Sequence, residues 1–181
     1  MIKRCLFLTA VSIFFSIAFT THAEEAVINK KMVAALKKYN PRFVAWKTGD
    51  YTPTIQKDSI EKKRYPYALI LDVNGDKKND LILDGHDDKN SLLICLISTP
   101  KGYGVIVLRQ IDLLNPEKLE NMNDGNKETG LNYYLWPNKE GTGFTLAYPQ
   151  QTDTKGNLLN DGAMIDYLFK DGEFQESYQT L

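Results

Sequence analysis

The sequence predicts an α+β protein in which one N-terminal helix packs on a mostly antiparallel β-sheet of about seven or eight strands. Near the start of the chain, apolar residues recur at helical spacing. Further along, short runs rich in β-branched and aromatic residues alternate with Gly, Pro, Asn and Asp, which is typical of strands joined by turns. The hydrophobic content of 43% is enough for a packed core and excludes a disordered chain.

The first residues indicate export. Lys3 and Arg4 precede an uncharged, largely apolar run over residues 5–19, and Thr21 and Ala23 offer small residues at a cleavage site. We therefore expect a signal peptide over residues 1–23, one domain over residues 24–181, and a periplasmic or secreted location. The apolar run is shorter than the ~20 residues that a membrane span needs, and no second run follows, so no transmembrane segment is expected after cleavage.

Cleavage would leave few residues for cysteine or histidine chemistry. It would remove Cys5 and His22, so that Cys95 and His86 remain. A single cysteine forms no intramolecular disulfide, and a zinc site built from several Cys and His ligands is excluded. Cys95 lies within an apolar run and is expected to be a buried thiol. The formal charge would fall from −1 to −3, and this balance does not suggest a nucleic-acid partner.

The N-terminal helix is predicted over residues 24–39. Its apolar positions fall on one face at helical spacing, and Asn40-Pro41 should end it. Residues 43–46 are expected to form a short strand, and residues 57–64 a charged, solvated connection. The apolar positions of the helix are Ile28, Met32, Ala35, Leu36 and Tyr39.

Two groups of strands are predicted after this connection. A turn at Pro100–Gly102 should join two strands of the first group, and Asp171-Gly172 is a strong signal for a hairpin because type I′ turns need positive φ at both central residues. One helical turn is expected over residues 115–122, and polar loops over 123–130 and 150–161. The predicted strands cover residues 67–71, 81–83, 91–98, 103–108, 131–136, 144–148, 163–169 and 174–178.

One loop carries a pattern of metal ligands. Oxygen-bearing side chains occur at its positions 1, 3, 5 and 9, and the carbonyl of the residue at position 7 can add another oxygen. Ca²⁺ takes six to eight oxygen ligands, which water could complete, whereas Mg²⁺ demands a stricter octahedron, so calcium is the expected cofactor. The predicted ligands are Asp72, Asn74, Asp76, Lys78 through its carbonyl, and Asp80.

The loop is not an EF-hand, because Lys77 and Leu83 stand where that motif requires Gly and Glu. The stretch YALILDVNGDKKNDLIL resembles instead the calcium loop of FG-GAP/VCBS repeats, known from integrin α-chain propellers and from many exported bacterial proteins. The resemblance implies the same five ligands. It does not imply a propeller, which needs at least four blades. The alternative is a metal-free hairpin held by Asx turns.

The leading functional hypothesis is a non-catalytic exported domain with a calcium-stabilised β-hairpin loop and a binding or structural role toward a protein or glycan ligand. The first alternative is a secreted hydrolase that uses the acidic region after the loop. Asp84, His86 and Asp87 would have to share a cleft there, with Ser91 as a possible nucleophile.

The second alternative is an envelope protein inhibitor or immunity partner. Such a protein would expose an apolar or aromatic patch of several hundred Å². The aromatic residues that could supply it are Tyr133, Tyr134, Trp136 and Tyr148.

Overall fold

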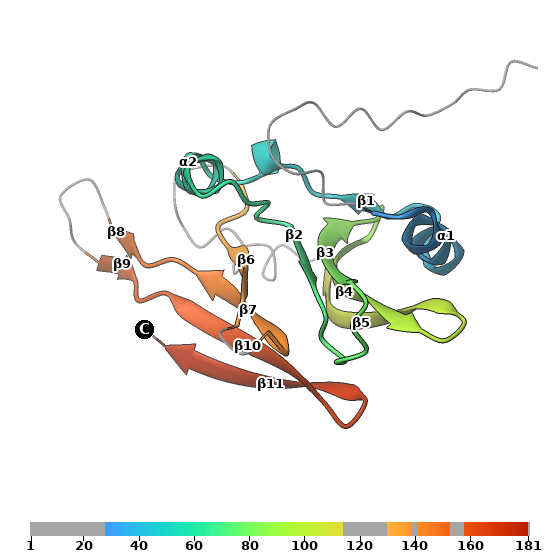
Figure 1. Ribbon diagram of the computed structural model, residues 1–181. Helices are drawn as coiled ribbons and strands as arrows, with labels where there is room; N and C mark the ends of the chain where they lie inside the picture. Colours follow the sequence, from blue (N-terminus) through green and yellow to red (C-terminus); the bar gives the residue numbers. More distant parts are fainter. Residues whose placement is uncertain (1–27, 114–129, 139–140, 153–157, 181) are drawn as a thin grey trace, which may run out of the picture.

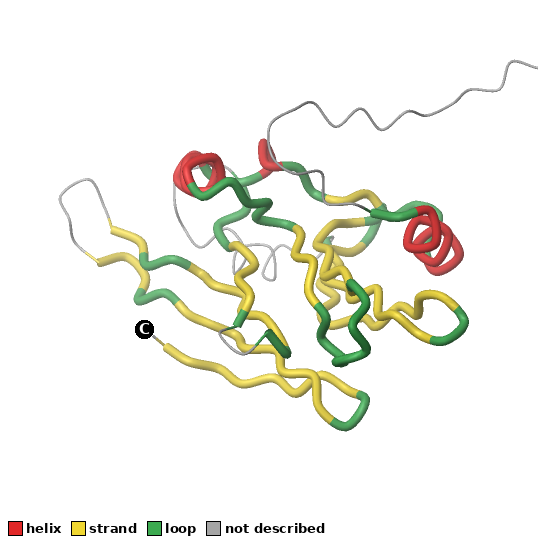
Figure 2. Tube along the Cα trace, in the orientation of Figure 1, coloured by secondary structure: helices red, strands yellow, loops and turns green. Residues whose placement is uncertain are grey.

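The computed structural model describes residues 28–113, 130–138, 141–152 and 158–180 (Figure 1). Strands make up about half of this part of the chain, and they form two main antiparallel sheets (Figure 2). The predicted signal peptide, the helical turn at 115–122 and most of the polar loop at 123–130 lie outside the described residues.

The first sheet contains five strands. Strand β3 (Asp80–His86) pairs with β4 (Asn90–Thr99), and β4 pairs with the long strand β5 (Gly102–Asp112). The other edge of β3 is shared by β1 (Val44–Ala45) and β2 (Ala68–Leu71), each of which pairs with a different part of it. A Cβ atom on Gly85 would lie 2.3 Å from the carbonyl oxygen of Val44, so only glycine lets β1 approach β3 at this point.

The second sheet contains four strands in the order β11-β10-β7-β6. They are β6 (Tyr134–Pro137), β7 (Gly143–Tyr148), β10 (Ala163–Lys170) and β11 (Glu173–Thr180). The hairpin predicted at Asp171-Gly172 is confirmed, because the φ angles of these residues are 55° and 91°. A small two-stranded ribbon, β8 (Gln151–Thr152) with β9 (Leu158–Asn160), occupies part of the predicted polar loop.

The helices are short. Helix α1 (Lys30–Tyr39) begins at Asn29, whose side-chain oxygen accepts the N–H groups of Lys31 and Met32 at 3.0 Å, and it ends at Asn40 as predicted. A 3₁₀ turn, η1 (Thr48–Asp50), is followed by helix α2 (Pro53–Glu61). Residues 57–61, predicted to be part of a charged connection, are therefore helical, and Pro53 at the first helical position favours this start.

The predicted fold class is wrong. The described part of the chain is mostly β, with main sheets of five and four strands and two short α-helices, and no N-terminal helix in it packs on a single large sheet. Only Met32 of α1 is fully buried, so this helix lies beside β5 and does not provide a layer of the core. The single-sheet prediction failed because β6 pairs with β7 and not with β5, which starts a second sheet.

The two sheets share one core. A single hydrophobic cluster contains Leu81, Ile94 and Leu96 of the first sheet together with Phe144 and Leu146 of the second. The backbone also joins the two regions: the N–H of Leu135 donates to the carbonyl oxygen of Pro66 at 3.1 Å, next to β2. Within the described residues, no helix is long and apolar enough to cross a membrane.

Candidate functional site

The loop predicted to bind calcium connects β2 to β3. Asp72 Oδ1 and Asn74 Oδ1 both accept the N–H of Asp76, at 3.1 and 3.0 Å, and Asp72 Oδ2 accepts the N–H of Lys77 at 2.8 Å. Asp76 Oδ1 in turn accepts the N–H of Lys78 at 2.9 Å. These successive Asx turns wind the loop and bring the side chains of Asp72, Asn74 and Asp76 together.

Asp80 occupies a different place, because its carboxylate is fully buried. Its Oδ2 accepts the N–H of Val73 at 2.9 Å, and its Oδ1 accepts the N–H of Ser98 on β4 at 2.6 Å. A carboxylate, with its two acceptor oxygens, is well suited to such paired backbone donors. Asp80 therefore fastens the beginning of the loop to both β3 and β4.

Sequence reasoning missed Ser98, which joins the loop to the sheet. Its hydroxyl donates to Asp76 Oδ2 at 2.8 Å, and Asn74 Nδ2 donates to the carbonyl oxygen and the hydroxyl of Ser98 at 3.1 and 3.2 Å. Ser98 is 18 residues from Asp80, and no local spacing could have indicated it. Only the pairing of β3 with β4 brings it to the loop.

The loop contains two residues in the left-handed region, Gly75 with φ of 74° and Lys77 with φ of 64°. This conformation costs a lysine about 1 kcal/mol. The ammonium of Lys78 lies 3.1 Å from Asp76 Oδ2. Desolvation opposes ionisation of Asp76, but hydrogen bonds from the Ser98 hydroxyl and from Lys78 outweigh it, and the pKa of Asp76 is lowered.

No group of three or more His, Cys, Asp or Glu side chains within the described ranges is arranged to hold a metal ion. The carboxylates of Asp72, Asp76 and Asp80 consequently do not form a ready-made cage. Each carboxylate nevertheless has about four acceptor positions, and backbone N–H groups occupy only some of them. The oxygen donors of the loop suit a hard cation such as Ca²⁺, which tolerates irregular geometry.

The residues of the hydrolase alternative do not form a catalytic pair. His86 stacks on Trp46 with ring centroids 4.2 Å apart, and its Nδ1 lies 3.3 Å from the carbonyl oxygen of Asp87. The Ser91 hydroxyl is buried and has no hydrogen-bond partner among the residues that the structure describes. The Asp87 carboxylate accepts N–H groups of the turn at Lys89 and Asn90, at 2.8 Å each.

Asp84 lies fully buried on β3 and faces charged and aromatic groups. Its Oδ1 is 3.9 Å from Arg109 Nη2 on β5, and the hydroxyl of Tyr51 donates to its Oδ2 at a long 3.5 Å. Arg109 also donates through Nη1 to the hydroxyl of Tyr148 at 2.7 Å and lies over the ring of Tyr133. Burial raises the pKa of Asp84 to about 6, although the charge of Arg109 acts in the opposite direction.

The four aromatic residues of the inhibitor alternative do not form one exposed surface. Tyr133 is completely buried, and Tyr134 and Tyr148 are half-buried. Trp136 is 43% exposed, but the guanidinium of Arg64 lies 4.3 Å from its ring centre and 4.4 Å from that of Tyr134. This cation–π arrangement covers part of the aromatic surface.

Comparisons of this chain with protein-family models, with curated proteins and with solved structures found no match.

Proposed function

We propose that this chain is a non-catalytic exported domain, periplasmic or secreted, whose loop over residues 72–80 binds calcium. The winding of the loop supports this proposal most directly. Three oxygen-bearing side chains, those of Asp72, Asn74 and Asp76, are gathered within one short turn by hydrogen bonds to the backbone. Such bonds reduce the conformational entropy that ordering the ligands would otherwise cost.

In this proposal calcium has a structural role. The ion would be held by Asp72, Asn74, Asp76, the carbonyl of Lys78 and Asp80, and it would offset the repulsion between clustered carboxylates. Lys78 already places one positive charge 3.1 Å from Asp76, so calcium would replace an internal cation. Millimolar extracellular calcium suits a weak site of this kind.

The braced loop would hold β2, β3 and β4 in register, because Asp80 and Ser98 join it to these strands. We propose that the domain then presents a surface to a protein or glycan ligand. The predicted export supports this binding or structural role.

A calcium titration followed by thermal unfolding tests the proposal. A site with a Kd near 0.1 mM should stabilise the native state by about 1.4 kcal/mol at 1 mM calcium, because the ion binds only the folded chain. Magnesium at the same concentration should stabilise it less, since magnesium demands a stricter octahedral geometry than calcium and gives up its bound waters reluctantly.

Two matched variants make this test specific. Asp76→Asn removes one charged ligand from an exposed position and should abolish most of the calcium effect. Asp171→Asn makes the same chemical change in the exposed turn between β10 and β11, where Asn also accepts positive φ, and it should leave the effect intact. An unfolding midpoint of the unmodified chain that does not respond to calcium would refute the site.

A further inference from the structure

A cleft of about 630 Å³ lies where three segments meet: the start of α1, the 72–80 loop and the turn between β4 and β5. Its lining includes Lys30, Lys31, Lys78 and Lys101, and it includes no acidic side chain. The volume is within the range of sites for small molecules.

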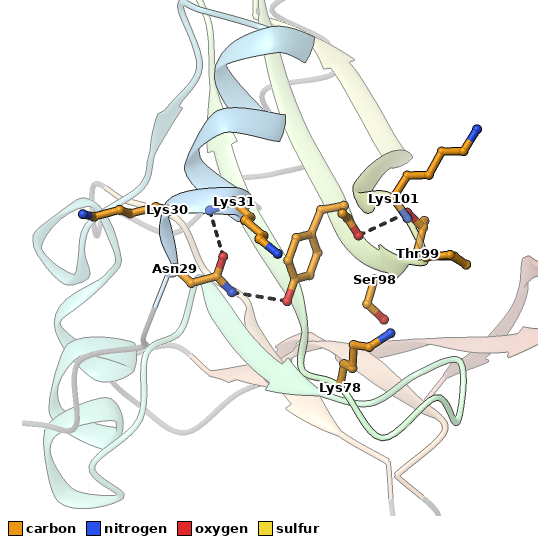
Figure 3. Close-up of a pocket in the computed structure, with 10 residues that line it drawn as sticks. Asn29, Lys30, Lys31, Lys78, Ser98, Thr99 and Lys101 are labelled. Carbon is orange, nitrogen blue, oxygen red and sulfur yellow. Dashed lines mark hydrogen bonds between the residues drawn. The ribbon is translucent and has the colours of Figure 1, made fainter.

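Four lysines line this cleft, and two of them point into it (Figure 3). Lys31 and Lys78 point inward, toward the middle of the view and the side of Ser98, while Lys30 and Lys101 extend outward on opposite sides. Hydrogen bonds fix the side chain of Tyr103, which lines the cleft between these lysines. Asn29 Nδ2 donates to the Tyr103 hydroxyl at 3.2 Å, and this hydroxyl donates to the carbonyl oxygen of Asn79 at 3.1 Å.

Most of this positive charge has no internal partner. Among the described residues, the ammonium groups of Lys30, Lys31 and Lys101 form no ion pair, whereas Lys78 is paired with Asp76. Like charges gathered at one cleft repel each other, and a bound anion would remove that cost. The N-terminal N–H groups of Lys31 and Met32 are already accepted by Asn29, so the lysines and not the helix end provide the attraction.

We propose that this cleft binds an anion that carries phosphate groups. The lysines come from three separate segments and place several positive charges along one cleft, which suits an anion with more than one negative charge, such as a phosphate or pyrophosphate. Lysine binds phosphate as a flexible point charge, so the outer pair, Lys30 and Lys101, can fold toward a ligand that the inner pair contacts first. The cleft shares Lys78 with the proposed calcium loop, and two of its other lining residues, Ser98 and Tyr103, form hydrogen bonds to that loop.

Titration of the full chain with inorganic pyrophosphate in calcium-free buffer, followed by calorimetry, tests this proposal. The unmodified chain should bind with saturation, and the variant K31A/K101A should bind at least about tenfold more weakly, because it loses two charge-assisted contacts. The control K37A/K38A removes two exposed lysines from the last turn of the same helix, outside the cleft, and should bind as the unmodified chain does. A thermal unfolding curve without ligand shows that each variant is folded.

A second measurement identifies the source of the phosphate group. If a lipid headgroup enters the cleft, the chain should sediment with vesicles that contain phosphatidylglycerol, and K31A/K101A should reduce the sedimented fraction. If the chain binds pyrophosphate but not these vesicles, the cleft is assigned to a soluble ligand. Equal loss of pyrophosphate binding in K31A/K101A and K37A/K38A would overturn the proposal, because it would show a general charge effect. Failure of the unmodified chain to bind either probe would overturn it as well.

Discussion

Two aspartates of strand β3, Asp80 and Asp84, are both fully buried, yet they are stabilised in opposite ways. Asp80 accepts the backbone N–H groups of Val73 and Ser98 at 2.9 and 2.6 Å. Asp84 faces Arg109 at 3.9 Å and has only one backbone donor, the N–H of Gly85 at 3.1 Å. Backbone donors are fixed in place by the strands, whereas a side-chain partner ties the stability of Asp84 to one other residue.

This comparison also separates two regions of the molecule. The surroundings of Asp80 belong to the first sheet and to the proposed calcium loop. The surroundings of Asp84 join both sheets, since Arg109 of β5 bonds to Tyr148 of β7. We therefore expect changes near Asp84 to affect the stability of the whole molecule, and changes near Asp80 to affect the loop most.

Arg109→Met should have the largest effect. It leaves the buried Asp84 carboxylate without a cation, and breaking a buried ion pair in this way costs about 3–5 kcal/mol of unfolding free energy. Denaturant unfolding at neutral pH measures this loss. The double variant Asp84→Asn/Arg109→Met should recover part of it because no uncompensated charge remains, and a double variant as unstable as Arg109→Met alone would contradict the role given to the pair.

The change in unfolding free energy with pH should be nearly as large as the effect of Arg109→Met. The pKa of Asp84 is about 6 in the folded chain and near 3.8 when unfolded. Between pH 3.8 and pH 6, the folded chain therefore holds a proton on Asp84 that the unfolded chain has released. The stability contributed by this proton is complete below about pH 4 and is lost as pH rises through about 6, a change of up to about 3 kcal/mol. Urea unfolding across this window measures it.

Asp84→Asn is the control for the pH experiment, because it cannot titrate and should flatten the curve between pH 4 and 6. The lowered pKa values of Asp58, Asp76 and Asp87 act in the opposite direction and at lower pH, since their stabilisation is lost as pH falls below their usual range. If the unfolding free energy changes with pH equally in the unmodified chain and in Asp84→Asn, the pH dependence belongs to other groups.

Asp80→Asn should have the smallest effect of the three. The amide that replaces the carboxylate presents one NH₂ group to a backbone N–H, which leaves a buried donor unsatisfied at a cost of about 1–3 kcal/mol. Hydrogen exchange at Val73 and Ser98 in calcium-free buffer should accelerate more than exchange in the second sheet. Uniform acceleration across both sheets would show that Asp80 stabilises the whole molecule and not mainly the loop.

The sequence predicted local elements better than their assembly. The continuous apolar runs at 67–71 and 91–98 became β2 and β4, and Asp171-Gly172 formed its turn, because strand propensity and turn chemistry depend on neighbouring residues. Separation into two sheets depends on which edges pair across long stretches of chain, and no local pattern encodes that choice.

The same limit applies to the candidate sites. Asp72, Asn74 and Asp76 were predictable because alternating oxygen-bearing residues in a tight loop are a local pattern. Ser98 and Arg109 were not, since each gains its role from a neighbour on another strand. The lysine-lined cleft was equally hidden, because Lys31, Lys78 and Lys101 come from three separate segments.

Cys95 lies in the middle of β4 with no exposed surface, and burial raises the pKa of its thiol far above the usual range. A thiol in this state reacts with an alkylating reagent only after the strands around it separate. The rate at which Cys95 is alkylated therefore measures how often the first sheet opens, and no label has to be introduced into the chain. The chain thus carries a chemical reporter beside Asp80, in the region where calcium is proposed to act.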